Sequence, residues 1–393
     1  MSEWPLVRLG VLVTKIGSGA TPRGGASVYR EEGISFIRSQ NILDNSMLLD
    51  GVARITDEAA DALRSVTVLA GDVLVNITGD SVARTSLVDP AVLPARVNQH
   101  VAVIRTNGRL DSRFLQKYLV SPRGKTALMT LATGGATRKA LTKAHLESLA
   151  IPLPPLGEQR AIGEVLGALD DKIAANTKLA ATARELALAM VPVAGDRAPV
   201  RELATLQKAQ IDPGTLGDEA VDHYSLPAFD SRNGPEVVKA TSIKSSKFVV
   251  SEPSVLISKL NPRFPRVWDL ARLNGRRALA STEFLVLEPR GISTSVLWSL
   301  LAQPSFGRAL ESKVAGTSGS HQRVKPIEVL LAGVSDPRGW PDESRASIES
   351  LSSAALAADA ENRTLAAIRD ALLPQLMSGG LRVRDFERVA DGT

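Results

Sequence analysis

The chain has 393 residues, of which 44% are hydrophobic and 23% charged, the balance of a globular protein with two or three domains. It has no cysteine, which excludes disulfides, iron–sulfur clusters, thiolate zinc sites and cysteine nucleophiles, and its four histidines have no partner at helical spacing, so we expect no metal site. Neither a signal-peptide pattern nor an apolar stretch of about 20 residues is present, so we expect a cytoplasmic protein.

Charge is unevenly distributed along the chain. The net charge is +5 over residues 1–150, −1 over 151–199, +4 over 200–335 and −3 over 336–393. Two basic blocks therefore alternate with two slightly acidic ones. Basic domains attract the phosphate backbone of nucleic acids, although an excess of this size is also common on ordinary solvated surfaces.

The first segment, residues 1–154, has the pattern of a mixed domain. Short β-rich runs, such as Gly71 to Asn76 and His100 to Arg105, are bounded by Gly, Pro, Asn and Asp residues. A helical stretch from Asp111 to Leu119 follows them. This pattern predicts an α+β fold with a mainly antiparallel sheet.

The second segment, residues 155–198, predicts one long helix. Pro152, Pro154 and Pro155 stiffen the exit from the first domain, and the helix is expected from about Glu158 until Pro192 closes it. Apolar or small residues alternate at spacings of four and three, which is typical of a coiled-coil seam. The seam positions are Ile162, Leu166, Leu169, Ile173, Asn176, Ala180, Ala183, Ala187 and Met190.

The third segment, residues 199–337, repeats the first at an offset near 182. The run "GDVLVN" at Gly71 returns as "PSVLIS" at Pro253, and "HVAVIR" at His100 returns as "EFLVLE" at Glu283. Any one short match would arise by chance, so the constant offset is the informative feature. It predicts two copies of one domain.

The fourth segment, residues 338–393, predicts a second long helix with a less regular seam. Pro374 is expected to kink or close this helix. Its many alanines allow a close approach to a second helix, but an ordinary helix that faces a domain core would show a similar stripe. The seam positions are Leu351, Ala355, Ala358, Asn362, Leu365, then either Ile368 or Arg369, and finally Leu372 and Leu376.

Each seam carries one asparagine, Asn176 or Asn362, and the two lie 186 residues apart. A polar residue in a coiled-coil seam fixes the register. If the helices pair antiparallel, the two asparagines are expected near a local two-fold axis, where they could face each other. The predicted pairing residues are Leu169, Ile173, Asn176, Ala358, Asn362 and Leu365.

Polar loops recur at matching places in the two copies. "TGGATRKALTKAHL" at Thr133 and "TSGSHQRVKPIEVL" at Thr317 combine glycines, which let a backbone approach closely, with groups that reach phosphates or base edges. Alone, each would be an ordinary polar loop. The candidate DNA contacts are Thr21, Arg23, Arg38, Ser39, Asn41, Thr137, Arg138 and Lys139 in the first copy, and Lys259, Arg263, Arg266, Ser320, His321, Gln322, Arg323 and Lys325 in the second.

No catalytic set stands out in the sequence. "NPRF" at Asn261 resembles the [DN]PP[YF] motif of adenine methyltransferases, but Arg263 replaces the second proline and no strand with a glycine-rich cofactor turn stands in the expected place. We therefore expect a protein that is not an enzyme. A stand-alone adenine-specific DNA methyltransferase remains the alternative, and a coiled-coil scaffold that binds no DNA is a weaker one.

The chain resembles the specificity subunits of type I restriction-modification systems over nearly its whole length. The junction "IPLPPLGEQRAIGEVLGALDDKIAANTKL" at Ile151 carries the most specific part of the resemblance, and "AGDVLV" at Ala70 and "LPQLMSGGLRV" at Leu373 add to it. The resemblance implies two target recognition domains that each read half of a split DNA site, separated by two long helices in an antiparallel coiled coil. The expected domains are target recognition domain 1 (1–154), spacer helix 1 (155–198), target recognition domain 2 (199–337) and spacer helix 2 with the C-terminal tail (338–393).

The resemblance also implies partners. Two modification subunits would bind S-adenosylmethionine and methylate adenine, and any restriction subunits would use ATP and Mg²⁺, so no cofactor is expected in this chain. Pro154, Pro155, Glu158 and Gln159 are the implied docking residues. The second junction departs from the family pattern, because Asp342, Glu343 and Ser344 stand where another proline run with Glu-Gln would be, which makes a second docking contact less certain.

Overall fold

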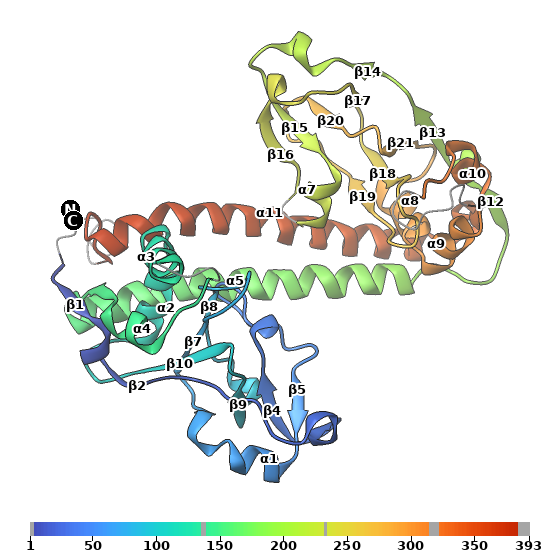
Figure 1. Cartoon of the computed structure of the whole chain (residues 1–393). Coiled ribbons are helices and arrows are strands. Elements are labelled where there is room, and N and C mark those ends of the chain that lie inside the picture. Colours follow the sequence, from blue (N-terminus) through green and yellow to red (C-terminus); the bar gives the residue numbers. More distant parts are fainter. Residues whose placement is uncertain (1–3, 135–138, 232–233, 314–321, 384–393) are drawn as a thin grey trace. The chain divides into compact units, whose positions relative to one another are not determined.

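The computed structural model describes residues 4–134, 139–231, 234–313 and 322–383. Its contacts divide the chain into two compact units: unit 1 contains Met1–Lys172 and Leu365–Thr393, and unit 2 contains Ile173–Thr364. Figure 1 shows the chain and labels many of its helices and strands. The domain boundaries expected from the sequence remain a prediction.

Unit 1 contains three sheets. The strand orders are β1-β11, β2-β10-β7-β8 and β3-β5-β4-β9-β6, and all strand pairs are antiparallel except β4 with β9. The strands are β1 (Leu6–Arg8), β2 (Val13–Ser18), β3 (Tyr29–Arg30), β4 (Ile34–Ile37), β5 (Ala53–Ile55), β6 (Thr67–Val68), β7 (Val73–Asn76), β8 (Thr85–Leu87), β9 (Ala95–Val97), β10 (Val101–Thr106) and β11 (Ala150–Pro152).

Both faces of the β2-β10-β7-β8 sheet are buried. Successive side chains of a strand point to opposite faces, so Val73 and Val75 of β7 join one apolar cluster while Leu74 joins another. The first cluster lies against the helices, and the second fills the space towards the β3-β5-β4-β9-β6 sheet. The α-helices of unit 1 are α1 (Asp57–Ala62), α2 (Ser112–Val120), α3 (Pro122–Thr133), α4 (Lys143–Ser148), the first part of α5 (Leu156–Ala189) and the last part of α11 (Asp342–Ser378).

Unit 2 repeats this arrangement of sheets. Its strand orders are β12-β22, β13-β21-β18-β19 and β14-β17-β20-β15-β16, again with one parallel pair, β15 with β20. The strands are β12 (Arg197–Pro199), β13 (Ala204–Gln207), β14 (Gln210–Ile211), β15 (Ala220–Tyr224), β16 (Glu236–Lys239), β17 (Lys247–Val250), β18 (Ser254–Ser258), β19 (Val267–Leu270), β20 (Ala278–Ala280), β21 (Phe284–Pro289) and β22 (Gly333–Ser335).

The cores of the two units also match. Val255 and Ile257 of β18 join the cluster that packs on the helices, whereas Leu256 faces the other sheet, as Leu74 does in unit 1. The predicted repeat and the α+β class are therefore confirmed. The α-helices of unit 2 are the second part of α5, then α6 (Val200–Leu203), α7 (Leu226–Asp230), α8 (Thr294–Leu301), α9 (Pro304–Glu311), α10 (Pro326–Leu331) and the first part of α11 (Asp342–Ser378).

The long helices α5 and α11 pack against each other antiparallel within each unit. In unit 1 the first turns of α5, with Ile162 and Leu166, share a cluster with Leu373 and Leu376 near the end of α11. In unit 2 the residues that meet are four buried alanines with Leu351: Ala180, Ala183, Ala355 and Ala358. Residues further along α5 therefore contact residues nearer the start of α11, as expected for an antiparallel pair. Of the predicted pairing residues, Ile173, Asn176 and Asn362 take part in hydrogen bonds between the two helices, Ala358 joins the alanine cluster of unit 2, and Leu169 packs against the core cluster of unit 1. Pairing through Leu365 remains a prediction.

One detail of the helix prediction was wrong: Met190 is 39% exposed, because α5 already ends at Ala189. Pro374 lies inside α11, which continues to Ser378, so it does not close the helix. Asn176 and Asn362 lie close together, since Asn176 bonds to Glu361, the neighbour of Asn362, and Asn362 bonds to Ile173 and Thr177 of α5.

Arg369 takes the seam position after Leu365, which the sequence left open between Ile368 and Arg369. The Arg369 guanidinium bonds to Asp170 at 2.8 Å, and Asp170 also pairs with Lys117, while Ile368 is exposed. In the described parts of the chain, no helix is both long and apolar enough to cross a membrane.

Candidate nucleic-acid interface

Three chain segments cross at one end of the central sheet of unit 1. The backbone N–H of Ile77, just after β7, donates to the carbonyl of His100, just before β10, at 2.9 Å. The carbonyl of Ile77 accepts from the N–H of Leu141 at 2.8 Å, and Thr78 forms an isolated bridge with Ala140. Ala140 and Leu141, which belong to the polar segment at Thr133, are therefore anchored beside the two central strands.

Unit 2 contains the same crossing. The N–H of Lys259 donates to the carbonyl of Glu283 at 2.8 Å, the carbonyl of Lys259 accepts from Val324 at 3.0 Å, and Leu260 forms a bridge with Arg323. These residues lie 182 or 183 positions after their counterparts in unit 1. Lys259 and Leu260 thus meet Arg323 and Val324, although the two pairs lie more than 60 positions apart in the sequence.

Polar side chains at the crossing of unit 1 form a hydrogen-bonded chain. Thr21 bonds to the amide oxygen of Gln99, the Gln99 amide nitrogen lies 3.1 Å from His100 Nε2, and His100 Nδ1 lies 2.6 Å from the hydroxyl of Thr78. Because the Gln99 amide donates, His100 Nε2 accepts and its proton is on Nδ1, which donates to Thr78. The exposed side chain of Arg23 is two residues from Thr21.

The crossing of unit 2 is organised by ion pairs instead. Arg323 makes two bonds to Glu283, at 3.1 and 2.9 Å, and these bonds lower the pKa of the Glu283 carboxyl. Arg266 likewise makes two bonds to Asp230, at 2.7 and 2.9 Å, which lower the pKa of Asp230. A bidentate pair fixes the orientation of a guanidinium, so these two arginines are held in place by their carboxylates.

The loop between β18 and β19 presents an exposed cation and an exposed ring. The guanidinium of Arg263 lies 5.8 Å from the centre of the Phe264 ring, which is 62% exposed. The loop is closed by a hydrogen bond from Phe264 N–H to the carbonyl of Asn261 at 2.9 Å, and Asn261 has a positive φ of 49°. An arginine stacked on a ring and open to solvent suits contact with phosphates or bases.

The predicted DNA contacts differ in their access to solvent. The exposed ones are Thr21, Arg23, Lys139, Arg263, Arg323 and Lys325, and the half-buried ones are Arg38, Ser39, Lys259, Arg266 and Gln322. Thr137, Arg138, Ser320 and His321 lie outside the described residues. Whether the accessible residues contact DNA stays a prediction.

Asn41 is a correction to the set, since its side chain is 1% exposed. Its amide oxygen accepts from the N–H of Arg38 at 3.0 Å, and its amide nitrogen donates to the carbonyl of Leu48 at 3.2 Å. Both halves of the amide are therefore used to close the turn after β4. The Arg38 side chain donates to the carbonyl of Gly51 at 3.2 Å and stabilises the same turn.

The expected docking residues are divided between interior and surface. Gln159 is 1% exposed, and its side-chain bonds among the described residues stay within its own unit. Pro154 is buried, Glu158 is half-buried and Pro155 is exposed. Glu158 accepts a hydrogen bond of 3.2 Å from the N–H of Val383. Gln159 thus lies in the interior rather than on a docking surface, while docking through Pro155 and Glu158 remains a prediction.

Four site residues were missed in the sequence: Thr78, Gln99, His100 and Glu283. His100 was treated as an isolated histidine, yet His100 and Glu283 directly precede the two matched strands β10 and β21. The equivalent positions of His100 and Glu283 in the two repeats were the signal from which both could have been identified. Over the described ranges, no group of three or more His, Cys, Asp and Glu side chains could hold a metal ion.

Comparisons with known proteins confirm the family resemblance. Residues 1–184 match the sequence model of the type I restriction modification DNA specificity domain. The chain is 33% identical over 177 residues to the MjaX specificity subunit of a type I restriction enzyme from Methanocaldococcus jannaschii, a match that covers 44% of this chain and 37% of that protein. A 72-residue match, 40% identical, to a type I restriction enzyme specificity subunit of Haemophilus influenzae covers 18% of this chain and 17% of that protein.

A solved structure extends the likeness to the whole fold. The structure is similar to the crystal structure of the S subunit of a type I restriction-modification system from M. genitalium, with a TM-score of 0.62 at 14% identity. The similarity covers 95% of this chain and 96% of the other. The sequence matches, by contrast, span well under half of each curated relative.

Proposed function

Because residues 1–184 belong to the family of type I restriction modification DNA specificity domains, we propose that the chain is the non-catalytic subunit that selects the DNA sequence in such a system. It reads a split site on double-stranded DNA, one half with each unit. It recruits modification subunits that bind S-adenosylmethionine and methylate adenine. In a full system it also joins restriction subunits that use ATP and Mg²⁺.

The duplicated crossing of three segments is the observation that supports the proposal. Both units use the same backbone hydrogen bonds to anchor two residues of a polar segment, 140–141 or 323–324, beside two central strands. The side chains on this common frame differ, with Thr78, Gln99 and His100 in unit 1 and Arg323 and Glu283 in unit 2. One frame with two sets of hydrogen-bonding groups fits two different half-sites, because base edges are distinguished by donor and acceptor patterns.

The groups at the two crossings suit different roles in DNA contact. Arg23, Arg263, Lys139 and Lys325 are exposed cations, which suit phosphates and sequence-independent affinity. The oriented Arg323 guanidinium and the Thr78–His100 pair have fixed donor directions, which suit base edges. We therefore propose that phosphate contacts and base reading lie side by side in each unit.

A stand-alone adenine methyltransferase is not favoured. That alternative depends on Asn261 to Phe264, which lie between β18 and β19. Nucleotide cofactors in open α/β sheets bind at the carboxyl ends of parallel strands, whereas β18 is antiparallel to both of its neighbours, β19 and β21. The side-chain oxygen of Asn261 is also buried, which turns it away from a substrate base.

The experiment compares the purified chain alone with the chain co-purified with a modification subunit from the same host. We expect S-adenosylmethionine binding, measured by calorimetry, and adenine methylation of duplex DNA only when the modification subunit is present. Tight cofactor binding or methylation by the chain alone would overturn the proposal. So would failure to bind duplex DNA and any modification subunit.

A further inference from the structure

The two units differ at the contact between a long helix and the first turn of a shorter one: α5 with α2 in unit 1, and α11 with α8 in unit 2. In unit 1, Gln159 of α5 fills this place. Its amide oxygen accepts from the N–H of Asp111 at 2.8 Å, and its amide nitrogen donates to the carbonyls of Arg109 and Pro154, at 3.1 and 2.8 Å. Unit 1 therefore closes this site with a carboxamide of its own.

A glycine allows α5 to come this close. A Cβ atom added to Gly163 would lie 3.0 Å from Cβ of Arg113 and 3.3 Å from the backbone nitrogen of Phe114. Both distances are tighter than ordinary van der Waals contact. α5 thus lies against the start of α2 at a separation that suits only a residue without a side chain.

Unit 2 has different residues at both matching positions. The spacing of 186 that relates Asn176 to Asn362 places Arg345 where unit 1 has Gln159, and Glu349 where it has Gly163. The helices that face them, α2 and α8, are also equivalent. Ser293 caps α8 by accepting from the N–H of Val296, as Asp111 caps α2 by accepting from the N–H of Phe114. In unit 2, α11 therefore carries the large side chain of Glu349 at the position where α5 of unit 1 has Gly163, the glycine that lies against α2.

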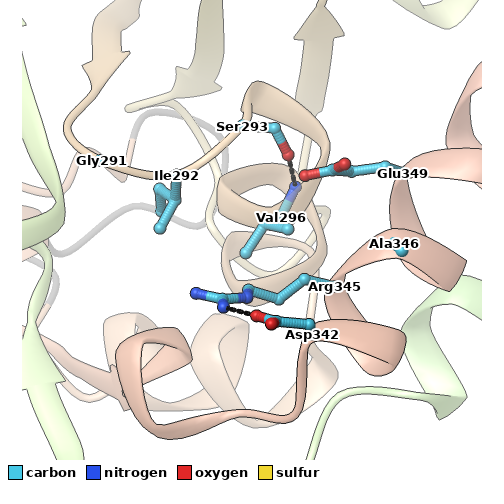
Figure 2. A pocket seen from close by; sticks show the side chains of 8 residues that line it. All are labelled: Gly291, Ile292, Ser293, Val296, Asp342, Arg345, Ala346 and Glu349. Atoms are coloured by element: carbon cyan, nitrogen blue, oxygen red, sulfur yellow. Dashed lines mark hydrogen bonds and ion pairs between the residues drawn. The ribbon is translucent and has the colours of Figure 1, made fainter.

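The result is an open pocket of about 450 Å³ in unit 2, which we call the socket; it is lined by Gly291, Ser293, Val296, Arg345, Ala346 and Glu349, among others. Figure 2 shows Arg345 folded back onto Asp342 on one side, and the Glu349 carboxylate directed towards Ser293 and Val296 on the other. Arg345 consequently does not take over the bonds that Gln159 makes in unit 1.

Hydrogen-bonding groups are left unused in the socket. Gly291 and Ser293 are the counterparts of Arg109 and Asp111. Among the described residues, the carbonyl of Gly291 and the N–H of Ser293 make no hydrogen bond. The carboxylate of Glu349 likewise has no cationic partner within the described ranges, whereas the charges of Arg345 and Asp342 offset each other.

We propose that the socket binds a segment of a second protein that presents a primary carboxamide beside a basic side chain. The carboxamide bonds to Gly291 and Ser293 as Gln159 bonds to their counterparts, and the cation pairs with Glu349. A volume of this size takes several side chains rather than one. The inference rests on the proposed function, under which this second protein is a modification subunit, and it makes the two docking sites of the chain unequal.

The test fills the socket and counts the bound subunits. Ala346→Trp places a large ring in the socket, and Ala354→Trp on the same exposed side of α11, outside the socket, is the matched control. The full chain is co-purified with the modification subunit of its host and weighed by native mass spectrometry. We expect two modification subunits on the wild type and on A354W, and one on A346W at subunit concentrations tenfold above those that saturate the wild type.

A second variant closes the socket with the residues of unit 1. Arg345→Gln combined with Glu349→Gly restores the pair found in unit 1, and we expect this variant also to bind one modification subunit while its thermal unfolding stays cooperative. If the wild type binds two subunits and both socket variants also bind two, the socket inference is wrong and the proposed function stands. If the wild type binds none, the proposed function itself fails.

Discussion

The side-chain amide of Asn176 donates a hydrogen bond of 2.8 Å to the carboxylate of Glu361, from α5 to α11 within unit 2. Asn362 makes the reciprocal contact, because its amide donates to the carbonyl of Ile173 at 3.2 Å and to the hydroxyl of Thr177 at 3.1 Å. Beside these bonds the helices meet through alanines. Since alanines pack equally well in several registers, the asparagines select the register.

Asn176→Ala should weaken the pairing of the two helices. Asn176 is 3% exposed and its bond to the exposed Glu361 is partly buried, so loss of the amide removes a hydrogen bond to a charged group, at a cost of about 1.5 kcal/mol. We expect faster hydrogen exchange of the α5 and α11 amides in unit 2. Lys178→Ala, an exposed position of the same helix, is the control and should leave the exchange rates unchanged; equal rates in the two variants would show that Asn176 does not hold the register.

Gln159→Glu should destabilise unit 1 in a pH-dependent manner. One carboxylate oxygen can still accept from Asp111, but the other would face the carbonyls of Arg109 and Pro154 without a proton to donate. This environment raises the pKa of the introduced carboxyl above its ordinary value, so the loss of stability grows as the pH rises through that range. The expected loss at pH 8 is about 3 kcal/mol.

The measurement for Gln159→Glu is the melting temperature at pH 5 and at pH 8. Arg160→Gln, the exposed neighbour, is the control and should melt with the wild type at both values. A Gln159→Glu protein that melts with the wild type at pH 8 would contradict the role of Gln159 as an internal connection.

The buried Asp269 and the ion-paired Asp230 should make the stability of the chain depend on pH in opposite directions. Burial raises the pKa of Asp269, which accepts from the Ser295 hydroxyl at 2.7 Å, whereas Arg266 lowers the pKa of Asp230. Stability from Asp269 therefore falls as the pH rises above the ordinary aspartate pKa, while stability from Asp230 is present above that pKa and is lost as the pH falls through the lowered one.

The corresponding measurement compares Asp269→Asn and Asp230→Asn with the wild type between pH 3 and pH 7. As the pH rises over this range, the melting temperature of the Asp269→Asn variant should rise relative to the wild type. That of Asp230→Asn should fall relative to it, with most of the fall below pH 4. Parallel curves for either variant would show that its carboxyl does not titrate differently in the folded chain.

The sequence predicted the repeat and the long helices well, because both depend on periodicity. The offset near 182 reflects equivalent strands, and the heptad spacing reflects real packing at Ile162, Leu166, Ala180 and Ala355. Such signals survive in a single sequence because every position of the pattern repeats the same physical requirement.

Individual site residues were harder to predict, because a polar side chain in a turn serves either the turn or a ligand. Asn41 and Gln159 belong to polar motifs, yet both satisfy backbone groups of their own unit. His100 was missed because its partner Thr78 is 22 positions away. The socket depends on Gly163 and Glu349, whose importance is visible only once the helix approach is known.

Arg23→Ala and Arg263→Ala should each weaken DNA binding by about tenfold, because each removes an exposed cation from one crossing. The slope of log affinity against log salt concentration should decrease by about 1 in either variant. Arg160→Ala, which removes one exposed positive charge from α5, is the control. A loss in the control equal to that in the two variants would indicate nonspecific attraction only.

Mapping of methylated adenines across the host genome tests the central claim most directly. We expect a split recognition sequence to be methylated in the wild-type strain, to lose its methylation when the gene is deleted, and to change in one half only when residues at one crossing are exchanged, for example Arg323 and Glu283. Methylation that persists without the gene, or an exchange at one crossing that alters both halves alike, would contradict the account.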